Sequence, residues 1–376
     1  MKLSVIVVVY NMTREAPRTL YSLSSAYQQG IREEDYEIIV VDNGSTRRLQ
    51  PTDYTRFGSN FQYHYLANAS PSPTAALNFG LQRARGEVIG IMIDGARICT
   101  PGLLHYARVG TEMYNRAVVA SVGFYLGQGF QRFAIMRGHD QDEEDRLLNR
   151  IGWPRDGYRL FEVGSLDESS HWAAPIAESN ALFMRKELWV EVGGVDERFD
   201  MPGGGVVNLD TFVRCCELPD SELIILLGEG TFHQVHGGVA TNAPPDLHEQ
   251  NCERWFAQYR EIRGKEFVCP TKPRKYVGHL PAHCLTDLIN DLLLSTSHPR
   301  IDEWEALAAG WQQEATRLQG EVERLSASWQ QEYTRLQDEM QGRLEAILAS
   351  PSWRWTRPLR GLISRSRNLV QRWNGS

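Results

Sequence analysis

The amino-acid sequence predicts an α/β protein whose mostly parallel sheet is flanked by helices. Apolar runs without polar alternation recur at Ser4–Val9, Glu37–Val41 and residues 88–93, which is typical of strands buried on both faces of a sheet. Helical patterns at residues 13–30 and 73–86 separate these runs. Strands and helices therefore alternate along the chain, as they do around a parallel sheet.

The strand that ends at Asp94 is the most informative of these elements. It is a short apolar run bounded by Gly86 and Gly95, and Arg97 follows closely. Ligands of open α/β sheets bind beyond the carboxyl ends of the strands, so a charged pair at this end is placed to meet a ligand. An aspartate after a strand also caps turns, and Asp94 alone does not decide between these two interpretations.

Two other predicted strands also end in polar side chains. The first ends in Tyr10 and Asn11, and the second ends in Asp42. A nucleotide needs an aromatic face for its base and acceptors for the base edge or the ribose hydroxyls, and these residues supply both at neighbouring strand ends. No GxGxxG follows the first strand and no GxxxxGK[ST] occurs in the chain, so neither a dinucleotide fingerprint nor a P-loop is indicated.

The composition excludes several other classes of protein. The formal net charge of −7 argues against a general nucleic-acid binder. The six cysteines form no CxxC pair, which favours reduced thiols in a cytoplasmic protein over a zinc site or a disulfide framework. No segment approaches the ~20 apolar residues of a transmembrane helix.

Between residues 117 and 227 the expected elements are less regular. Strands are predicted at residues 117–127 and at Leu223–Leu227, with an irregular region at 128–178 between them. The acidic run Asp140–Asp145 is interpreted as the solvated start of a helix. The glycine triplet Gly203–Gly205 precedes a helical pattern, where the backbone can approach a ligand closely.

Residues 228–238 are expected to form a functional loop. His233 and His236 lie there among glycines, directly after a buried strand; a pair of surface histidines is the alternative interpretation. An amphipathic helix with Trp255 is predicted at residues 246–263.

The C-terminal part of the chain has a different pattern. A linker with a short helix is predicted at 269–300, and a coiled coil at 301–349, where apolar residues recur in steps of four and three. We expect this coiled coil to join copies of the chain into a homo-oligomer. Residues 350–376 contain six arginines interleaved with tryptophans and no acidic residue. Such a tail suits an anionic membrane surface, which predicts a peripheral membrane protein; RNA binding and a disordered tail are the alternatives.

Four stretches of the chain resemble the GT-A fold glycosyltransferases, and in particular glycosyltransferase family 2. They are Ser4–Asn11, Ile39–Ser45, the strand that ends at Asp94, and Ser179–Phe199 with its Gly-Gly-Val-Asp-Glu-Arg-Phe turn. The resemblance covers about residues 1–265, so that residues 1–268 form the expected GT-A domain, with a Rossmann-like sheet. It implies transfer of a sugar from a nucleotide-diphosphate donor to a glycan or lipid-linked acceptor, with inversion, in surface polysaccharide assembly.

The resemblance also implies roles for individual residues. The nucleotide sugar is bound by Tyr10, Asn11, Asp42, Asp94 and Gly95. The acceptor or diphosphate loop contains Gly204, Gly205 and His233. A divalent metal, Mg²⁺ or Mn²⁺, is held by Asp94 and His236.

This sequence departs from the family pattern at two positions. Ala96 replaces the second aspartate of the Asp-x-Asp motif, so the metal site is expected to be weak or absent, since Mg²⁺ and Mn²⁺ favour oxygen ligands. Arg97 then serves as a counter-charge for the diphosphate, because its fork matches phosphate oxygens.

The second departure concerns the catalytic base. Asn208 stands where the family has its catalytic aspartate. Asp210, two residues later, is the expected base, and Glu229 is the alternative.

The two departures leave a second class of function open, a non-catalytic GT-A-like subunit that binds nucleotide or glycan and holds partners through the coiled coil. A nucleotidyltransferase is disfavoured, since no glycine-rich basic loop follows the first strand.

Overall fold

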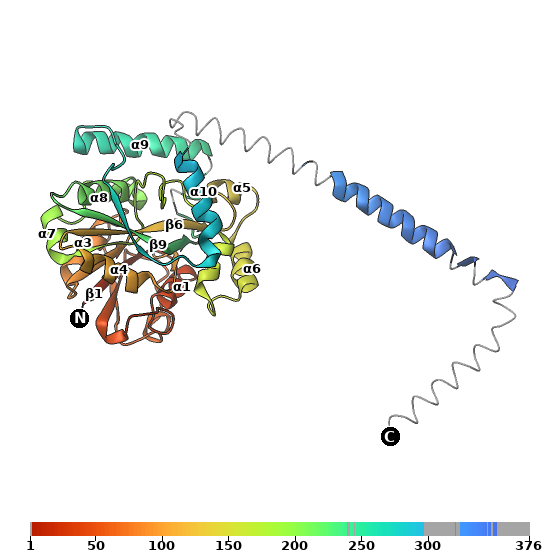
Figure 1. Cartoon of the computed structure of the whole chain (residues 1–376), viewed down its shortest axis with the longest axis horizontal. Helices are drawn as coiled ribbons and strands as arrows, with labels where there is room; N and C mark the ends of the chain where they lie inside the picture. Colours follow the sequence, from red (N-terminus) through yellow and green to blue (C-terminus); the bar gives the residue numbers. More distant parts are fainter. Residues whose placement is uncertain are drawn as a thin grey trace, which may run out of the picture. The chain divides into compact units, whose positions relative to one another are not determined.

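The computed structural model describes residues 2–238, 241–243, 245–296, 320, 324–343, 345–346 and 349–351. The chain divides into two compact units, Met1–Ser297 and His298–Ser376, and each is described by itself. The first unit contains a ten-stranded sheet with helices on its faces (Figure 1). The predicted α/β fold with a mostly parallel sheet is confirmed.

One continuous path of strands crosses the sheet, and two short strands pair outside this path. From one edge to the other the path is β10 (Arg274–Gly278), β9 (Glu222–His233), β6 (Ala117–Leu126), β8 (Leu182–Arg185), β4 (Val88–Met92), β1 (Leu3–Val9), β2 (Tyr36–Asp42) and β3 (Phe61–Tyr65). The two short strands are β5 (Arg97–Cys99), which pairs with β9, and β7 (Gly164–Leu166), which pairs with β6.

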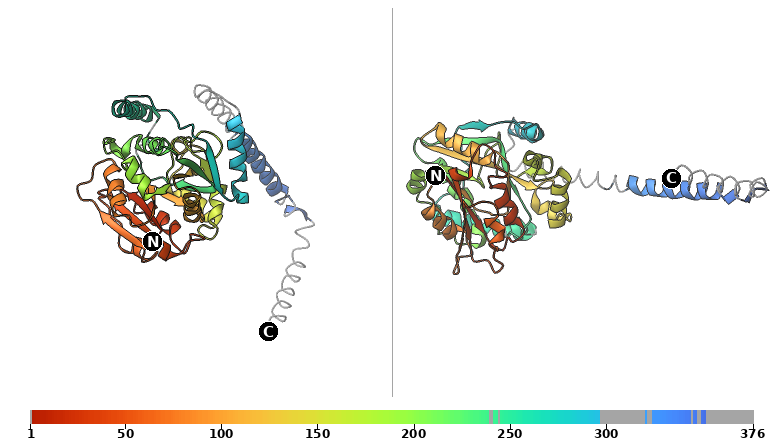
Figure 2. Two further views of the ribbon diagram at one scale, coloured as in Figure 1. Left: turned by 60° about the vertical axis from the view of Figure 1, so that its left-hand side comes forward. Right: turned by 90° about the horizontal axis from the view of Figure 1, so that it is seen from below.

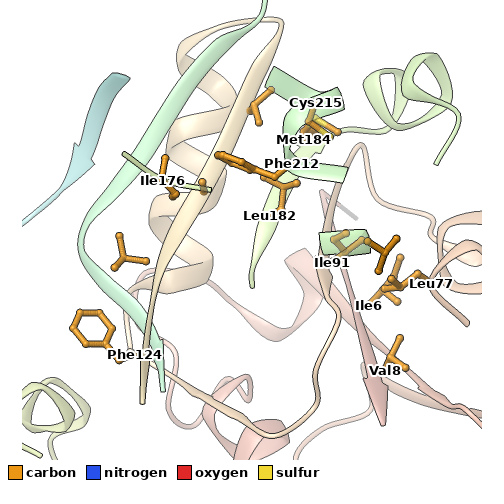
Figure 3. Close-up of a cluster of buried hydrophobic side chains, with 14 of the residues drawn as sticks. Ile6, Val8, Leu77, Ile91, Phe124, Ile176, Leu182, Met184, Phe212 and Cys215 are labelled. Atoms are coloured by element: carbon orange, nitrogen blue, oxygen red, sulfur yellow. The ribbon is translucent and has the colours of Figure 1, made fainter. Parts of the chain in front are cut away.

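Strand β1 lies in the parallel part of the sheet, between β2 and β4. All seven of its residues are buried. Because successive side chains point to opposite faces of a strand, Val5 and Val7 enter one core cluster while Ile6 and Val8 enter the other. Figure 3 shows Ile6 and Val8 in the larger cluster. Burial on both faces explains why this strand is a continuous apolar run.

Strand β4 pairs in parallel with β1 and antiparallel with β8. Its central residue, Gly90, lies opposite Phe183 of β8. A Cβ atom at position 90 would lie 2.3 Å from the Phe183 ring, so only glycine permits this packing. The Phe183 ring therefore fills the space that the missing side chain leaves.

The helices form two layers, one on each face of the sheet. Residues of α1 and α4 belong to the smaller core cluster, and residues of α3, α8 and α9 belong to the larger one. The α-helices are α1 (Glu15–Ser22), α2 (Thr52–Thr55), α3 (Thr74–Arg83), α4 (Leu103–Met113), α5 (Gln131–Met136), α6 (Gln141–Ile151), α7 (Lys186–Val192), α8 (Val207–Cys216), α9 (Pro245–Arg263) and α10 (Leu285–Thr296). The 3₁₀ turns are η1 (Glu33–Asp35), η2 (Gly157–Glu162), η3 (Pro202–Gly204) and η4 (Ala282–Cys284). Helix α9 lies at the outer edge of the unit in Figure 1 and in the left view of Figure 2.

The structure revises the expectation of a linker at 269–300. Residues 274–278 form β10, which pairs in parallel with β9. Helix α10 is anchored by Asp291, whose carboxylate accepts hydrogen bonds from the backbone N–H groups of Trp172 and Ala173 at 2.6 and 2.9 Å. The described part of this segment, up to residue 296, is therefore packed against the sheet unit.

The irregular region expected at 128–178 contains helices α5 and α6. The acidic run starts α6, with Asp140 capping the backbone N–H of Glu143 at 2.9 Å. The run is not fully solvated, however, because the Glu144 side chain is buried. It accepts hydrogen bonds from Arg14 at 3.1 Å and from the backbone N–H of Val235 at 2.6 Å, and so anchors the residues that follow β9.

The second unit is helical over residues 324–343. The residues predicted as a basic tail lie outside the described part of the chain from residue 352 onward, as does the first half of the predicted coiled coil. Among the described residues, no helix combines the length and hydropathy needed to cross a bilayer.

Candidate functional site

A cavity of about 880 Å³ lies beyond the carboxyl ends of β1, β2 and β4. The polar ends of those strands reach it through Tyr10, Asn11, Asn43 and Asp94. Other walls are formed by the residues after β7, by the glycines before α8 and by the aromatic residues of α9. Its position agrees with the rule that ligands bind beyond the carboxyl ends of parallel strands.

Asp94, His233 and His236 meet at one point of this cavity. The Oδ2 atom of Asp94 lies 2.7 Å from Nε2 of His233 and 3.4 Å from Nε2 of His236. The two imidazole Nε2 atoms are 3.0 Å apart. On the far side of His233, Nδ1 lies 2.6 Å from Oε1 of Gln131, which orients the ring with Nε2 toward the aspartate.

The electrostatics of this triad follow from its burial and its charges. Burial disfavours the charged form of Asp94, but the two histidines outweigh burial and hold the pKa of this carboxyl well below its usual range. Burial lowers the pKa of His233 to about 4. The pKa of His236 is raised despite burial, because Asp94 favours its charged form. Asp94 is thus a permanent anion beside two imidazoles.

Strand β5 explains how the triad forms. Arg97, which follows Asp94 closely in the sequence, begins β5 and pairs with His233 across the antiparallel ladder. Ala96 is fully buried in the smaller core cluster, so position 96 faces the core rather than the cavity. The second carboxylate of the family's Asp-x-Asp motif therefore has no equivalent at this position. The third atom that could bind a metal ion comes from His233 instead.

The Arg97 side chain is 6% exposed and lines the cavity. Its Nε and Nη1 atoms are buried and have no hydrogen-bond partner in the described part of the chain. A buried guanidinium with unused donors is costly unless a ligand supplies acceptors. The geometry is therefore suited to an anionic ligand beside the triad.

Tyr10 and Asn11 both line the cavity, as expected. Tyr10 is 53% exposed, which leaves its ring face available. The Oδ1 atom of Asn11 accepts hydrogen bonds from the backbone N–H groups of Thr46 and Arg47, each at 3.0 Å. Asn11 therefore ties the end of β1 to the loop after β2.

Asp42 and Gly95 do not line the cavity, in contrast to the expectation for both. Asp42 is fully buried, and its two carboxylate oxygens accept from the Ser45 N–H at 2.7 Å and from the Tyr63 hydroxyl at 2.5 Å. Gly95 packs against β1, where a Cβ atom would lie 2.5 Å from Val9. Both residues therefore lie behind the cavity wall and support the residues that form it.

Asn43 takes the place at the cavity wall that was expected for Asp42. Its Nδ2 atom donates to the carbonyl oxygens of Ser70 and Ser72, at 2.8 and 3.3 Å. These bonds fix the amide, and its Oδ1 atom is left buried without a partner in the described part of the chain. This oxygen offers an acceptor to a ligand in the cavity.

The glycine triplet lies at the cavity through Gly203 and Gly205, whereas Gly204 is buried behind them. Gly205 has φ +55° and lies under Trp255, where a Cβ atom would be 3.0 Å from the indole ring. Two backbone N–H groups of this triplet are already used within the chain. Those of Gly203 and Gly204 donate to the carbonyl oxygens of Pro71 and Met201.

Asp210, the expected base, is not a cavity residue. Its side chain is buried, and the carboxylate accepts from Nε of Arg214 at 2.8 Å and from Nε and Nη2 of Arg263 at 2.5 and 2.7 Å. Guanidinium donors from two arginines therefore occupy both oxygens of this carboxylate. The geometry assigns Asp210 to joining α8 and α9 and argues against its acting as the base.

Glu229, the alternative base, also lies away from the cavity. It is fully buried and accepts hydrogen bonds from the hydroxyls of Thr100 and Tyr158 and from the N–H of Gly102. Burial raises the pKa of this carboxyl to about 7. Glu229 lies inside β9, a strand that continues to His233, so the loop expected at 228–238 starts only at Gln234.

Several cavity residues were missed by the sequence analysis. They lie in the loop between β7 and β8 and at the start of α8, and they are Asp167, Ser169, Glu178, Asn180 and Asn208. Asp167, Ser169 and Glu178 fall outside regular strands and helices and outside any motif, so no spacing pointed to them. Asn180 lies in the stretch Ser179–Phe199 that resembles family 2, but the sequence analysis gave it no role. Asn208 was noted only as a missing aspartate, although the structure places its amide in the cavity wall.

Residues 4–108 match the model of the family Glycosyl transferase family 2. Over these residues the chain resembles the family 2 glycosyltransferases, and the predicted GT-A-like fold, with its mostly parallel sheet and flanking helices, is confirmed.

Solved structures similar to this chain include those of S. aureus TarS. The TarS 1-349 structure is 16% identical, with a TM-score of 0.41, over 69% of this chain and 66% of that one. A longer TarS structure is 15% identical, with a TM-score of 0.41, and this chain spans only 40% of it. Another TarS 1-349 structure, a complex with UDP-GlcNAc, is 16% identical, with a TM-score of 0.42, over 69% of this chain and 67% of that one. No curated protein sequence matches this chain.

The role of Asp210 predicts a loss of stability on substitution. Asp210→Asn removes the buried carboxylate from Arg214 and Arg263 and leaves Arg263 its ion pair with Asp196. We expect the free energy of unfolding to fall by about 2 kcal/mol. Urea denaturation measures this change. Asp145→Asn, which removes a half-exposed carboxylate from Arg14 and Arg18, serves as a control with an expected loss below about 1 kcal/mol. Equal stability of wild type and Asp210→Asn would contradict the assignment.

The buried Glu229 predicts a pH dependence of stability. Its folded pKa of about 7 exceeds the ordinary value of 4.5, so the folded protein holds a proton that the unfolded chain releases. This contribution to the unfolding free energy therefore falls as pH rises from about 4.5 to 7, by roughly 3 kcal/mol. Glu229→Gln removes the titrating group. We expect the stability difference between variant and wild type to shift in favour of the variant between pH 5 and pH 8, measured by urea denaturation; a difference independent of pH would refute this.

Proposed function

We propose that this chain transfers a sugar from a nucleoside-diphosphate donor to a hydroxyl acceptor, with inversion at the anomeric carbon. The observation that supports this most directly is the meeting of Asp94, His233 and His236 beside the unpartnered donors of Arg97 in one cavity. A leaving diphosphate develops negative charge in the transition state, and it needs fixed positive groups in such a position.

The nucleobase is proposed to bind between Tyr10 and Asn43. Tyr10 offers an exposed ring face, and the unpartnered Oδ1 of Asn43 is an acceptor for a ring N–H. Uracil has such an N–H, and stacking on a tyrosine suits a flat base. We therefore propose a UDP-sugar as donor. UDP-GlcNAc, with which TarS 1-349 forms a complex, is the first donor to test.

The triad residues fit a divalent cation. Two ligands each ~2.1 Å from one ion and at right angles lie ~3 Å apart, and the three ligand atoms here are 2.7, 3.0 and 3.4 Å apart. Two imidazoles with one carboxylate favour a metal softer than Mg²⁺, so Mn²⁺ is the better candidate of the two expected ions. A bound ion would supply Lewis-acid stabilisation of the diphosphate.

The chain's own residues hold the rest of the donor. Arg97 is proposed to bind the diphosphate oxygens through its fork, and its charge would add to that of a cation held by the triad rather than replace it. Gly203 and Gly205 leave room for the donor at the wall before α8. Trp255 and Phe256 of α9 line the cavity and offer apolar faces to the sugar rings of a glycan or lipid-linked acceptor. We propose that this acceptor belongs to surface polysaccharide assembly.

A second candidate function is a non-catalytic subunit that binds a nucleotide or glycan. The absence of acidic residues at positions 96 and 208 favours it, since both positions contribute to catalysis in the family pattern.

One experiment tests both candidates. The purified chain is incubated with Mn²⁺ and a panel of UDP-, GDP- and dTDP-sugars, with and without glycan acceptors, and free nucleoside diphosphate is measured. We expect release from a UDP-sugar. UDP binding by calorimetry without release from any donor would favour the non-catalytic subunit.

The same preparation tests the metal site. His236→Ala and His233→Ala each remove one of three ligands, and we expect Mn²⁺ affinity, measured by electron paramagnetic resonance, to fall at least tenfold. His105→Ala, at a distant histidine that contacts Gly30, is the control. Wild-type Mn²⁺ binding by His236→Ala would exclude the triad as the metal site.

We further propose that the helical residues 324–343 associate with a second copy of the chain. Five large apolar side chains on this helix are between 47% and 73% exposed: Leu325, Trp329, Tyr333, Leu336 and Met340. Their spacing of four, four, three and four residues places them along one face. Such a face on a helix is stabilised by burial against a partner helix.

If this face joins two copies of the chain, charges introduced on it are expected to disrupt the oligomer. Trp329→Glu/Leu336→Glu places two carboxylates in the proposed seam, and we expect it to be monomeric when light scattering shows wild type to be oligomeric. Gln330→Glu, outside the apolar stripe, is the matched control and keeps the wild-type mass. A wild-type chain that is monomeric at all concentrations would refute the seam.

A further inference from the structure

The cavity contains a second group of polar side chains, separate from the triad. Ser169 lies between two carboxylates, with its Oγ atom 2.9 Å from Oε1 of Glu178 and 3.1 Å from Oδ1 of Asp167. All three residues line the cavity. A single hydroxyl proton can be donated to only one of the two carboxylates at a time.

Asn208 holds the other oxygen of Glu178. Its Nδ2 atom lies 2.8 Å from Oε2 of Glu178. Position 208 is where the resemblance to family 2 places an acidic residue, so a carboxylate is present beside that position although it comes from a different part of the chain. Glu178 lies in the loop before β8, whereas Asn208 lies in α8.

The surroundings of Glu178 differ from those of Asp210. No arginine, lysine or histidine forms an ion pair with Glu178 in the part of the chain that the structure describes, and its two contacts there are a hydroxyl and an amide. Two neutral donors orient the Glu178 carboxylate, whereas guanidinium groups occupy both oxygens of Asp210. Glu178 is also partly exposed at the cavity, whereas Asp210 is 1% exposed.

Asp167 is less suited than Glu178 to act as a base toward a substrate. It is 2% exposed, and burial together with the negative charge of Glu178 raises its pKa to about 7, against the effect of Arg97. Two adjacent carboxylates avoid sharing two full charges when one keeps a proton. Asp167 is the more buried of the two, so Glu178 is the one that can meet a substrate.

Unused donors near these carboxylates indicate where a ligand lies. The Nδ2 atom of Asn180, which is 4% exposed, lines the same cavity and has no partner in the described part of the chain, like the Nε and Nη1 atoms of Arg97. Asn180 is two residues from Glu178, and its Oδ1 accepts from Asn208 at 3.3 Å. A hydroxyl that accepts from Asn180 would lie within reach of Glu178.

We propose that Glu178 is the general base that deprotonates the acceptor hydroxyl, oriented by Asn208 and Ser169. This proposal rests on the transferase function proposed above. In the step, the acceptor O–H bond breaks and its proton moves to a carboxylate oxygen of Glu178. The acceptor oxygen forms a bond to the anomeric carbon, while the bond from that carbon to the phosphate oxygen breaks and its electron pair leaves with the nucleoside diphosphate.

The test exchanges the amide and the carboxylate. Glu178→Gln keeps the size of the side chain but removes its basicity. The new amide can keep its oxygen toward Nδ2 of Asn208 and donate from Nε2 to the hydroxyl oxygen of Ser169. We expect kcat at saturating donor to fall about 10²- to 10⁴-fold, while the Kd of UDP with Mn²⁺ stays within twofold of wild type. The double variant Glu178→Gln/Asn208→Asp moves the carboxylate across the same hydrogen bond, and we expect it to regain at least tenfold in kcat over Glu178→Gln.

Asp210→Asn is measured in parallel as the competing base, at a temperature where circular dichroism shows it to be folded, and we expect it to keep kcat within threefold of wild type. If Glu178→Gln keeps kcat within threefold, or if Asp210→Asn loses as much as Glu178→Gln, the assignment of Glu178 is overturned while the transferase function stands. A wild-type chain that releases no diphosphate from any donor overturns the transferase function, and the base with it.

Discussion

The antiparallel pairing of β5 with the end of β9 determines where the candidate site forms. Arg97 pairs with His233 in this ladder, and the N–H of Gln234 continues it by bonding to the carbonyl of Ala96 at 2.8 Å. The carboxyl end of β4 is thereby brought against a segment more than 130 residues later in the chain. Without this pairing, Asp94 and the two histidines would have no common neighbour, and Arg97 would not be buried beside them.

The cavity has two groups of opposite character. Asp94 with its histidines and Arg97 suits the anionic part of a donor, whereas Glu178 and Asp167 suit a hydroxyl that must lose a proton. Asp167 is influenced by both, because Arg97 lowers its pKa while burial and Glu178 raise it. A transfer from a diphosphate to a hydroxyl requires positive charge near the leaving diphosphate and a base near the hydroxyl. The cavity provides separate places for these two functions.

Asp210 and Glu229 illustrate how an acidic residue in a promising sequence context can have a structural role. Asp210 follows a glycine triplet, but the helical turn directs it toward Arg214 and Arg263 instead of the cavity. Glu229 lies among glycines next to the histidines, but β9 extends through it and turns it toward Thr100 and Tyr158. In both cases the direction of the side chain was set by packing, which the order of residues does not record.

The pattern of residues was enough to predict the sheet and the polar residues that follow its strands. Burial on both faces demands continuous apolar strands, and Tyr10 and Asp94 follow two of them. The pattern also indicated His233 and His236, through their position after a buried strand. Only the tertiary structure decided that Ala96 faces the core, that Asn43 rather than Asp42 reaches the cavity, and that Glu178 lies beside Asn208. Those last contacts join segments 28 or more residues apart, and they depend on which strands pair and in which register, a choice made by the whole core rather than by any local pattern.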